Sequence, residues 1–418
     1  MNKIFILFIS ISLFLYGYAQ DLNESNSITL TEAIEIGLKN NPVIKSAYEN
    51  ISAVEGKFWS GISLPSPEIG VSYEFVPLGS GLNNYEERTF GISQAFEFPT
   101  NYFLRGSISG DENDIAYLNF KQSEIQITRQ IKTAYYNVLA KQKLLAIAKE
   151  NLQIADDFSK KAEIRYNVGE GTNLERLTAK VQFTEAKNIL ALAQNELKSS
   201  FAELNYSLGY SRLSDEKFIL IDSLAFSKFD TLSFENLYHL SLSSNQQIKI
   251  SELNVNALST ERTLAWSSLL PGFNISYFRQ SLGSDNNYYG ASLDISVPLW
   301  FLFDNRGQIQ YASAKVNIAE SELVSVKNEV YLNLTNAYND YSNNLQQVSL
   351  YQEHILPQAE EVYRSASASY DAGEITYIEY LQARQTIISS EKNYTEALLN
   401  YYRSIFSLEE IVGQKLLN

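Results

Sequence analysis

The sequence contains an internal repeat, and this duplication limits what the chain can fold into more than any other feature. The segment Tyr166-Asn-Val-Gly169-Glu170 recurs as Tyr370-Asp-Ala-Gly373-Glu374, at a separation of 204 residues. The same separation relates further pairs: Asn41 with Asn245, Pro67 with Pro271, Tyr73 with Tyr277, and Gly209 with Gly413. Register held over so many positions predicts two structural repeats, residues 20–210 and 231–418, joined by a connector over 211–230.

Each repeat carries the same order of periodic patterns. A short amphipathic helix begins near Leu30, with Thr29 or Thr31 as its cap, and a second helical piece continues to about Trp59. Period-two alternation then predicts two strands per repeat, around 69–75 and 90–98, and around 273–277 and 291–297. A long helix follows, from 107 to 165 or from 307 to 369, with Pro357 as a predicted kink. Glycine-containing hairpins at 167–172 and 371–376 lead into return helices over 173–208 and 377–412.

The N-terminal residues indicate secretion. Lys3 precedes an apolar run over 4–15, and Gly17 and Ala19 supply the small residues of a cleavage site. This pattern predicts a signal peptide over residues 1–19. The sequence contains no Cys, so neither a disulfide scaffold nor a lipidated N-terminal Cys is expected. No later stretch is apolar over the ~18 residues that a membrane-spanning helix needs.

The four alternating segments have the length and pattern of strands that cross a bilayer. We expect one side of each strand to face lipid and the other to face water; the two sets are Val71, Ile92, Ile275 and Leu293 against Ser72, Ser93, Ser276 and Ser292. A soluble four-stranded sheet with one buried face is the alternative. The aromatic residues at the strand–helix junctions favour the membrane, because such rings gather at headgroup level; they are Trp59, Tyr102, Trp266 and Trp300. Four strands are half of the smallest usual barrel, so oligomerisation is predicted.

Composition and motifs argue against catalysis. The formal net charge of −15 disfavours nucleic-acid binding. The sequence contains neither a phosphate-binding glycine loop nor a catalytic nucleophile motif, and Gly169-Glu-Gly171 lacks the third glycine of a dinucleotide fingerprint. His239 and His354 are the only histidines, and they make a poor metal site. We therefore expect neither enzyme activity, nor a metal centre, nor a cofactor.

The two hairpins are the predicted functional tip. Gly169, Glu170, Gly171, Gly373 and Glu374 lie in tight turns flanked by uninterrupted helical pattern. With Glu175, Asp371 and Glu379, they would surround an aperture with carboxylates, and such charged rings favour cations. The alternative is that these acids only complement helix N-termini.

Several motifs resemble the TolC family of outer-membrane efflux proteins. The segment 27–44, Ser-Ile-Thr-Leu-Thr-Glu-Ala-Ile-Glu-Ile-Gly-Leu-Lys-Asn-Asn-Pro-Val-Ile, is similar to its opening motif. Leu356-Pro-Gln-Ala-Glu360, Tyr370-Asp-Ala-Gly373 and Tyr380-Leu-Gln-Ala-Arg384 are similar to its closing motif. Gly91-Ile-Ser-Gln-Ala-Phe-Glu-Phe-Pro99 resembles the heavy-metal branch, the CusC- and CzcC-like proteins.

The resemblance implies an α+β membrane protein of the Gram-negative outer membrane, extending into the periplasm. It implies a homotrimer whose chains complete a 12-stranded barrel and a tube of 12 helices. The tip would dock a periplasmic adaptor that serves an inner-membrane pump, of the RND type or another. The cargo would be metal cations or small toxic compounds, conducted passively. Two alternatives stay open: the outer-membrane component of type I protein secretion, and a periplasmic coiled-coil scaffold or adaptor that forms no channel.

Overall fold

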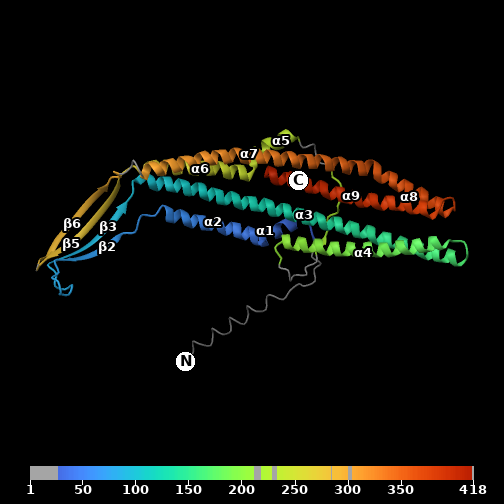
Figure 1. Cartoon of the computed structure of the whole chain (residues 1–418), viewed down its shortest axis with the longest axis horizontal. Helices are drawn as coiled ribbons and strands as arrows, with labels where there is room; N and C mark the ends of the chain where they lie inside the picture. Colours follow the sequence, from blue (N-terminus) through green and yellow to red (C-terminus); the bar gives the residue numbers. More distant parts are fainter. Residues whose placement is uncertain (1–26, 211–217, 228–232, 284, 300–303, 417–418) are drawn as a thin grey trace, which may run out of the picture.

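The computed structural model describes residues 27–210, 218–227, 233–283, 285–299 and 304–416. The molecule is an elongated rod, with a β-sheet at one end and long helices over the rest of its length (Figure 1). The predicted signal peptide and Trp300 lie outside the described residues. Within the described part, no helix is long and apolar enough to cross a membrane.

The elements recur in one order. The first half runs β1 (Ser27–Ile28), α1 (Leu30–Asn40), α2 (Pro42–Gly61), β2 (Glu68–Glu74), β3 (Glu87–Phe96), α3 (Pro99–Asn167) and α4 (Asn173–Ser207). The second half runs β4 (Ile219–Leu220), α5 (Phe234–Ser244), α6 (Gln246–Ser267), β5 (Gly272–Leu282) and β6 (Asp285–Ser296), and continues through α7 (Asp304–Leu350), the π-helix η1 (Tyr351–Ile355), α8 (Leu356–Asp371) and α9 (Tyr377–Val412). Each half therefore holds two short helices, a hairpin, a long outgoing helix and a return helix.

The four long strands form one antiparallel sheet in the order β2-β3-β5-β6. The central pairing of β3 with β5 joins the two halves, with Ile92 opposite Tyr277 and Ser93 opposite Ser276. Strands β2 and β6 are the edges, and each has a partner on one side only. The chain therefore supplies a sheet with two open edges.

The strand register separates the two sides of this sheet chemically. Directly opposed residues lie on the same side, so the pairings assign every position. The apolar face carries Ile69, Val71, Tyr73, Phe90, Ile92, Phe96, Phe273, Ile275, Tyr277, Tyr289, Leu293 and Ile295. The polar face carries Glu68, Ser72, Glu74, Glu87, Thr89, Ser93, Asn274, Ser276, Ser292 and Asp294. The predicted grouping of Val71, Ile92, Ile275 and Leu293 on one side is confirmed.

The phenyl ring of Phe278 breaks the alternation on the polar face. Phe278 lies on this face between Gly91 and Gly290, its partners on the two neighbouring strands. A Cβ added at Gly290 would meet the Phe278 ring. The glycine therefore leaves room for the ring to lie flat across β6, which explains a glycine inside a strand.

The outgoing helix α3 begins earlier than the sequence predicted. Its first residue is Pro99 rather than a residue near Ser107, and β3 ends at Phe96. Proline suits the first helical position because its fixed φ matches the helix and its missing N–H has no intrahelical partner there. Gly106 and Gly110 lie inside the helix without ending it. In 69 residues, α3 spans about 104 Å at 1.5 Å per residue.

The second outgoing helix is interrupted near the predicted kink. Helix α7 ends at Leu350, a single π-helical turn follows over Tyr351–Ile355, and α8 begins at Leu356. Pro357 lies in the first turn of α8, where its ring would clash with a preceding carbonyl in a regular α-helix. The wider turn lies immediately before the proline and accommodates it.

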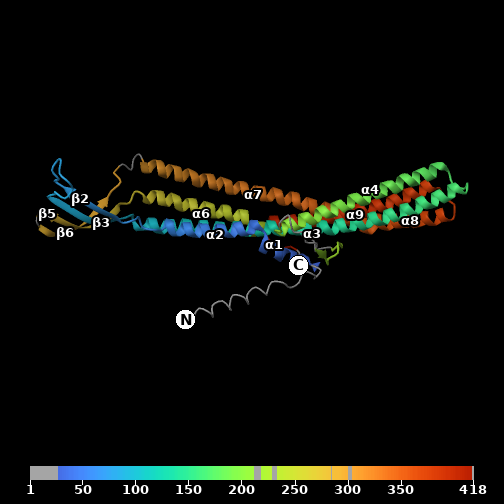
Figure 2. The same cartoon turned by 90° about the horizontal axis from the view of Figure 1, so that it is seen from below.

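The core lies midway along the rod, where the short helices pack against α3 and α9 (Figures 1 and 2). Thr29 caps α1 in a capping box with Glu32. The Tyr135 hydroxyl donates to the Asp222 carboxylate at 2.6 Å, and Asp222 also accepts from the Leu30 backbone N–H at 3.0 Å. These bonds fasten the connector residues 218–227 and the start of α1 to α3.

A buried ion pair joins the two halves at the same level. Lys132 of α3 and Glu409 of α9 approach to 2.5 Å, with side chains only 6% and 8% exposed. The Lys132 ammonium also lies 5.4 Å from the centre of the Phe406 ring. Removing one partner of such a pair leaves a buried charge uncompensated, so the pair holds α3 and α9 in one arrangement.

Candidate functional site

The helical hairpins α3–α4 and α8–α9 each end in a turn of the same type, and both turns lie at the end of the rod remote from the sheet (Figures 1 and 2). Gly169 has φ +81° and Gly373 has φ +76°. The Glu170 N–H donates to the Arg165 carbonyl at 2.9 Å, and the Glu374 N–H donates to the Ser369 carbonyl at 2.8 Å. Each turn is a Schellman motif with its glycine in the left-handed position. The sequence repeat around the glycines therefore encodes a repeated backbone turn.

The glycines at the tip differ in their surroundings. A Cβ added at Gly169 or Gly373 would meet nothing within 4 Å, so positive φ is the reason for glycine at both positions. A Cβ added at Gly171 would meet Arg165 at 3.1 Å. Gly169 and Gly373 thus present open backbone at the tip, whereas Gly171 allows close packing inside the first hairpin.

The acidic residues of the tip separate into two groups. Glu379 completes the capping box of α9: its carboxylate accepts from the Thr376 N–H at 2.7 Å, and this backbone bond lowers the pKa of Glu379. Glu175 lies in the first turn of α4 with its side chain 15% exposed. Glu170, Asp371 and Glu374 are exposed. Of these three carboxylates, Glu374 accepts from the Ser369 hydroxyl at 3.4 Å, and none of them forms an ion pair among the described residues.

Glu175 belongs to a polar network between the two hairpins. The Arg165 guanidinium lies 3.5 Å from the Glu175 carboxylate and donates to the Tyr370 hydroxyl at 3.3 Å. The Tyr370 hydroxyl in turn donates to Glu175 at 3.5 Å. Burial, and then the Glu175 charge, raises the pKa of Tyr370. From the sequence, Tyr370 stood out only as part of a motif and Arg165 was not predicted, because the network joins residues that are far apart in the chain.

Stacked aromatic rings pack next to this network, on the side away from the tip. Phe158 of α3 stacks on Tyr377 of α9 with ring centres 3.7 Å apart and planes 5° apart, and Tyr370 stacks on Tyr380 at 5.1 Å. One turn further from the tip, buried Arg384 donates to the Asn151 carbonyl at 2.6 Å. The inner ends of the two hairpins are therefore fixed to each other, while the glycine turns project beyond them.

At the other end of the rod, aromatic residues mark the junction of helices and sheet. Trp59 and Trp266 lie at the ends of α2 and α6 and are 70% and 56% exposed. Tyr102 differs from them, because it is half-buried and its hydroxyl accepts from the Glu97 N–H at 3.0 Å. The exposed ring of this turn is the neighbouring Phe103. Two of the predicted belt residues, Trp59 and Trp266, thus present their rings to the surroundings.

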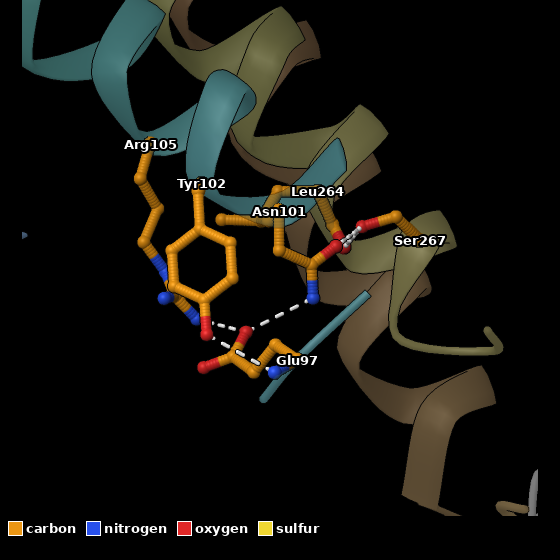
Figure 3. Close-up of polar contacts among 6 residues, drawn as sticks. All are labelled: Glu97, Asn101, Tyr102, Arg105, Leu264 and Ser267. Atoms are coloured by element: carbon orange, nitrogen blue, oxygen red, sulfur yellow. Dashed lines mark hydrogen bonds and ion pairs between the residues drawn. The ribbon is translucent and has the colours of Figure 1, made fainter. Parts of the chain in front are cut away.

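Figure 3 shows the polar network that fixes this junction. The Glu97 carboxylate accepts from Asn101 at 3.0 Å and from Arg105 at 2.5 Å. The Ser267 hydroxyl at the end of α6 donates to the Asn101 side chain at 2.5 Å. The network ties the end of β3 and the start of α3 to α6, so it sets the direction in which the sheet leaves the helices.

The described residues contain no group of three or more His, Cys, Asp or Glu side chains that could hold a metal ion. His239 lies exposed beside Glu235 at 3.1 Å, one helical turn away.

Comparison with known proteins places this geometry in context. The family profile described as outer membrane efflux protein matches residues 34–210 and 237–414. The cobalt-zinc-cadmium resistance protein CzcC of Cupriavidus metallidurans is 20% identical over 392 residues, which are 93% of this chain and 90% of CzcC. Two solved structures superpose with a TM-score of 0.78. The outer-membrane channel OprN is 17% identical, with 92% of this chain and 90% of OprN covered. CusC is 16% identical, with 96% of each chain covered.

The left-handed turns generate a test of stability. We expect Gly373→Ala to destabilise the folded chain by about 1 kcal/mol, because an L-residue is strained at positive φ. Gly110 is the matched control: it lies inside α3 with open space around it, and Gly110→Ala should stabilise by about 0.5–1 kcal/mol. Chemical denaturation of the two variants checks the difference. Equal stability changes of the same sign would contradict the account of the turn.

Proposed function

Because the chain belongs to the outer membrane efflux protein family, we propose that it is the outer-membrane channel of a tripartite efflux system. The protein resides in the outer membrane and extends into the periplasm. In this proposal, it conducts passively what an inner-membrane pump and a periplasmic adaptor deliver, and residues 1–19 direct its secretion. Residues 20–210 and 231–418 act as the two equivalent halves of each chain, with 211–230 as the connector.

The observation that carries the proposal is the sheet with one apolar face, one polar face and two open edges. An unpaired strand edge is costly in lipid because its backbone groups find no water. Closure by further copies of the chain pairs β2 of one copy with β6 of the next. Three copies give a barrel of twelve strands whose polar faces turn inward, and the proposed assembly is a homotrimer.

The helices supply the periplasmic part of the proposed conduit. Helix α3 reaches from the sheet to the tip, and it contacts α2, α6, α4 and α9 on the way. Exposed apolar side chains follow one side of α4, at Leu174, Leu177, Val181, Ile189 and Leu192. Such a stripe suits packing against a helix of a neighbouring copy. Three copies then surround a continuous tube.

The tip is the proposed docking rim for the adaptor. Gly169 and Gly373 leave the backbone open to close approach, and Glu170, Gly171 and Glu374 flank them. Asp371 joins the exposed acids of the proposed aperture. Glu175 enters it only when the Arg165–Tyr370 network opens, and Glu379 only when it leaves its capping box.

Metal cations are the favoured cargo, with small toxic compounds as the alternative. All charged residues assigned to the polar face of the sheet are acidic, so the interior of the closed barrel would attract cations. CzcC, which is similar to this chain over most of its length, is named for cobalt, zinc and cadmium resistance. An inner-membrane pump of the RND type would energise the export.

The assembly is tested by solution mass. We expect a homotrimer in mild detergent, because four strands leave two edges unpaired. Analytical ultracentrifugation of the outer-membrane fraction measures it directly. A folded, monodisperse monomer would refute the closed assembly.

The docking rim is tested by substitution of its glycines. The double variant Gly169→Val, Gly373→Val should assemble in the membrane but lose export, because the side chains block close backbone approach and strain both turns. Gly79→Val is the control, since Gly79 has φ +86° with open space around it but lies in the loop at the opposite end. Metal or drug tolerance of cells carrying each variant is the readout. A double variant that assembles and exports like the parent would rule out the rim.

A further inference from the structure

Charges of opposite sign lie on opposite faces of the sheet. The charged residues of the four strands are Glu68, Glu74, Glu87, Arg88, Arg279, Asp285 and Asp294. The register places Arg88 and Arg279 on the apolar face and every carboxylate on the polar face, with Asp285 opposite Leu282 beyond a shift of register. Among the described residues of the four strands, the two arginines are therefore the only charged groups on a face that otherwise suits lipid.

The two arginines are diagonal neighbours on the central strands. Arg88 is opposite Ser281, and Arg279 is opposite Phe90, so the two side chains rise from one patch about 5–8 Å apart at Cβ. Both are exposed. Neither makes an ion pair with a carboxylate of the described residues, and the Arg88 guanidinium instead lies 5.4 Å from the centre of the Tyr85 ring. The patch thus offers two unneutralised guanidinium groups.

The surroundings of the patch are those of a headgroup region. Tyr73 packs edge-on against Tyr85 at 5.2 Å, and Tyr277 lies 6.4 Å from Tyr289. The loop between β2 and β3 spans residues 75–86, where Glu86 is the only charged residue, and Leu78 and Leu82 of this loop are fully or largely exposed. Tyrosines at the rim and a loop above them with exposed leucines suit the boundary between hydrocarbon and water.

The distance of the patch from the helix end of the sheet also places it at this boundary. Arg88 lies eight positions before Phe96, which is at the helix end of β3. At about 3.3 Å per residue and a tilt of about 40°, Arg88 stands about 20 Å above Phe96. The apolar band of such barrels is about 25 Å tall. The long arginine side chains therefore reach the outer edge of the band, where phosphate groups lie.

We propose that Arg88 and Arg279 form a binding site for the phosphate groups of lipids in the outer leaflet, on the outer wall of the barrel. The inference rests on the proposed membrane insertion of the sheet. A guanidinium recognises phosphate through paired, charge-assisted hydrogen bonds, and two of them side by side suit a lipid that carries more than one phosphate. The aromatic rings and the leucines of the loop contact the acyl chains and the headgroup beside it.

The position of the pair in the sheet favours lipid over a neighbouring copy of the chain. Arg88 is on β3 and Arg279 is on β5, the two central strands, whereas copies of the chain would join at β2 and β6. Carboxylates of a neighbouring copy would stand on its polar face, on the other side of the wall. The lipid that surrounds the barrel is the partner that can reach both guanidinium groups.

The experiment measures lipid binding to the intact detergent-solubilised oligomer by native mass spectrometry. The probes are lipid A with both phosphates, the same lipid with its phosphates removed, and inorganic phosphate. We expect the parent protein to bind the phosphorylated lipid at least about tenfold more tightly than the dephosphorylated one, which corresponds to about 1.4 kcal/mol. Inorganic phosphate at equal concentration should not displace the lipid, because it lacks the acyl chains.

The variants carry the assignment to these residues. Arg88→Gln, Arg279→Gln should remove the preference for the phosphorylated lipid. Arg88→Lys, Arg279→Lys should keep only part of it, because an ammonium retains the charge but not the paired hydrogen bonds of a guanidinium. Arg364→Gln is the control, since this arginine lies 78% exposed on α8, far from the sheet. An unchanged preference in the double Gln variant would overturn the site. If that variant does not assemble, an undiminished preference in the double Lys variant would overturn it instead. Failure of the channel proposal itself would appear separately, as a chain that leaves the membrane without detergent.

Discussion

The pairing of β3 with β5 is the interaction on which the rest of the structure depends. It makes one sheet from two hairpins that belong to different halves of the chain, and its register fixes which side chains share a face. A slip of one residue would move every apolar side chain of a hairpin to the polar side. The same pairing leaves β2 and β6 as edges, and an edge in lipid needs another strand. The proposed assembly thus follows from the sheet rather than from the helices.

The helical part fastens the two halves to each other at three levels. Near the sheet, Ser267 of α6 bonds to Asn101 of α3; midway, Lys132 and Glu409 form a buried pair; near the tip, Phe158 stacks on Tyr377. Each contact joins an element of the first half to one of the second. Beyond the stack lie only the network of Arg165, Glu175 and Tyr370 and the two glycine turns. The molecule is therefore held firmly along its length and is most open at the end that would meet a partner.

Much of this arrangement could be predicted from the sequence, because local patterns encode local structure. The return helices and the left-handed glycines were predicted at the positions where they occur, since caps and turns depend on neighbouring residues. The family resemblance was also correct. The start of α3 was placed too late, because Pro99 was interpreted as the end of a strand rather than the first residue of a helix. Contacts between distant residues were not predictable in this way. Arg165 and Tyr370 show no periodic pattern that would place them together. Tyr102 was predicted as an exposed belt residue, but it is half-buried and its hydroxyl accepts from the Glu97 N–H.

The central claim is that the two faces of the sheet meet different solvents, and cysteine labelling tests it most directly. The chain contains no Cys, so a single engineered thiol reports one position without background. Ile275→Cys and Ser276→Cys are adjacent on β5 and lie on opposite faces. Treatment of intact cells with a membrane-impermeant maleimide should label the thiol at 276, which faces the water-filled interior, and leave the thiol at 275 unlabelled in lipid. Equal labelling of the two positions would contradict the account.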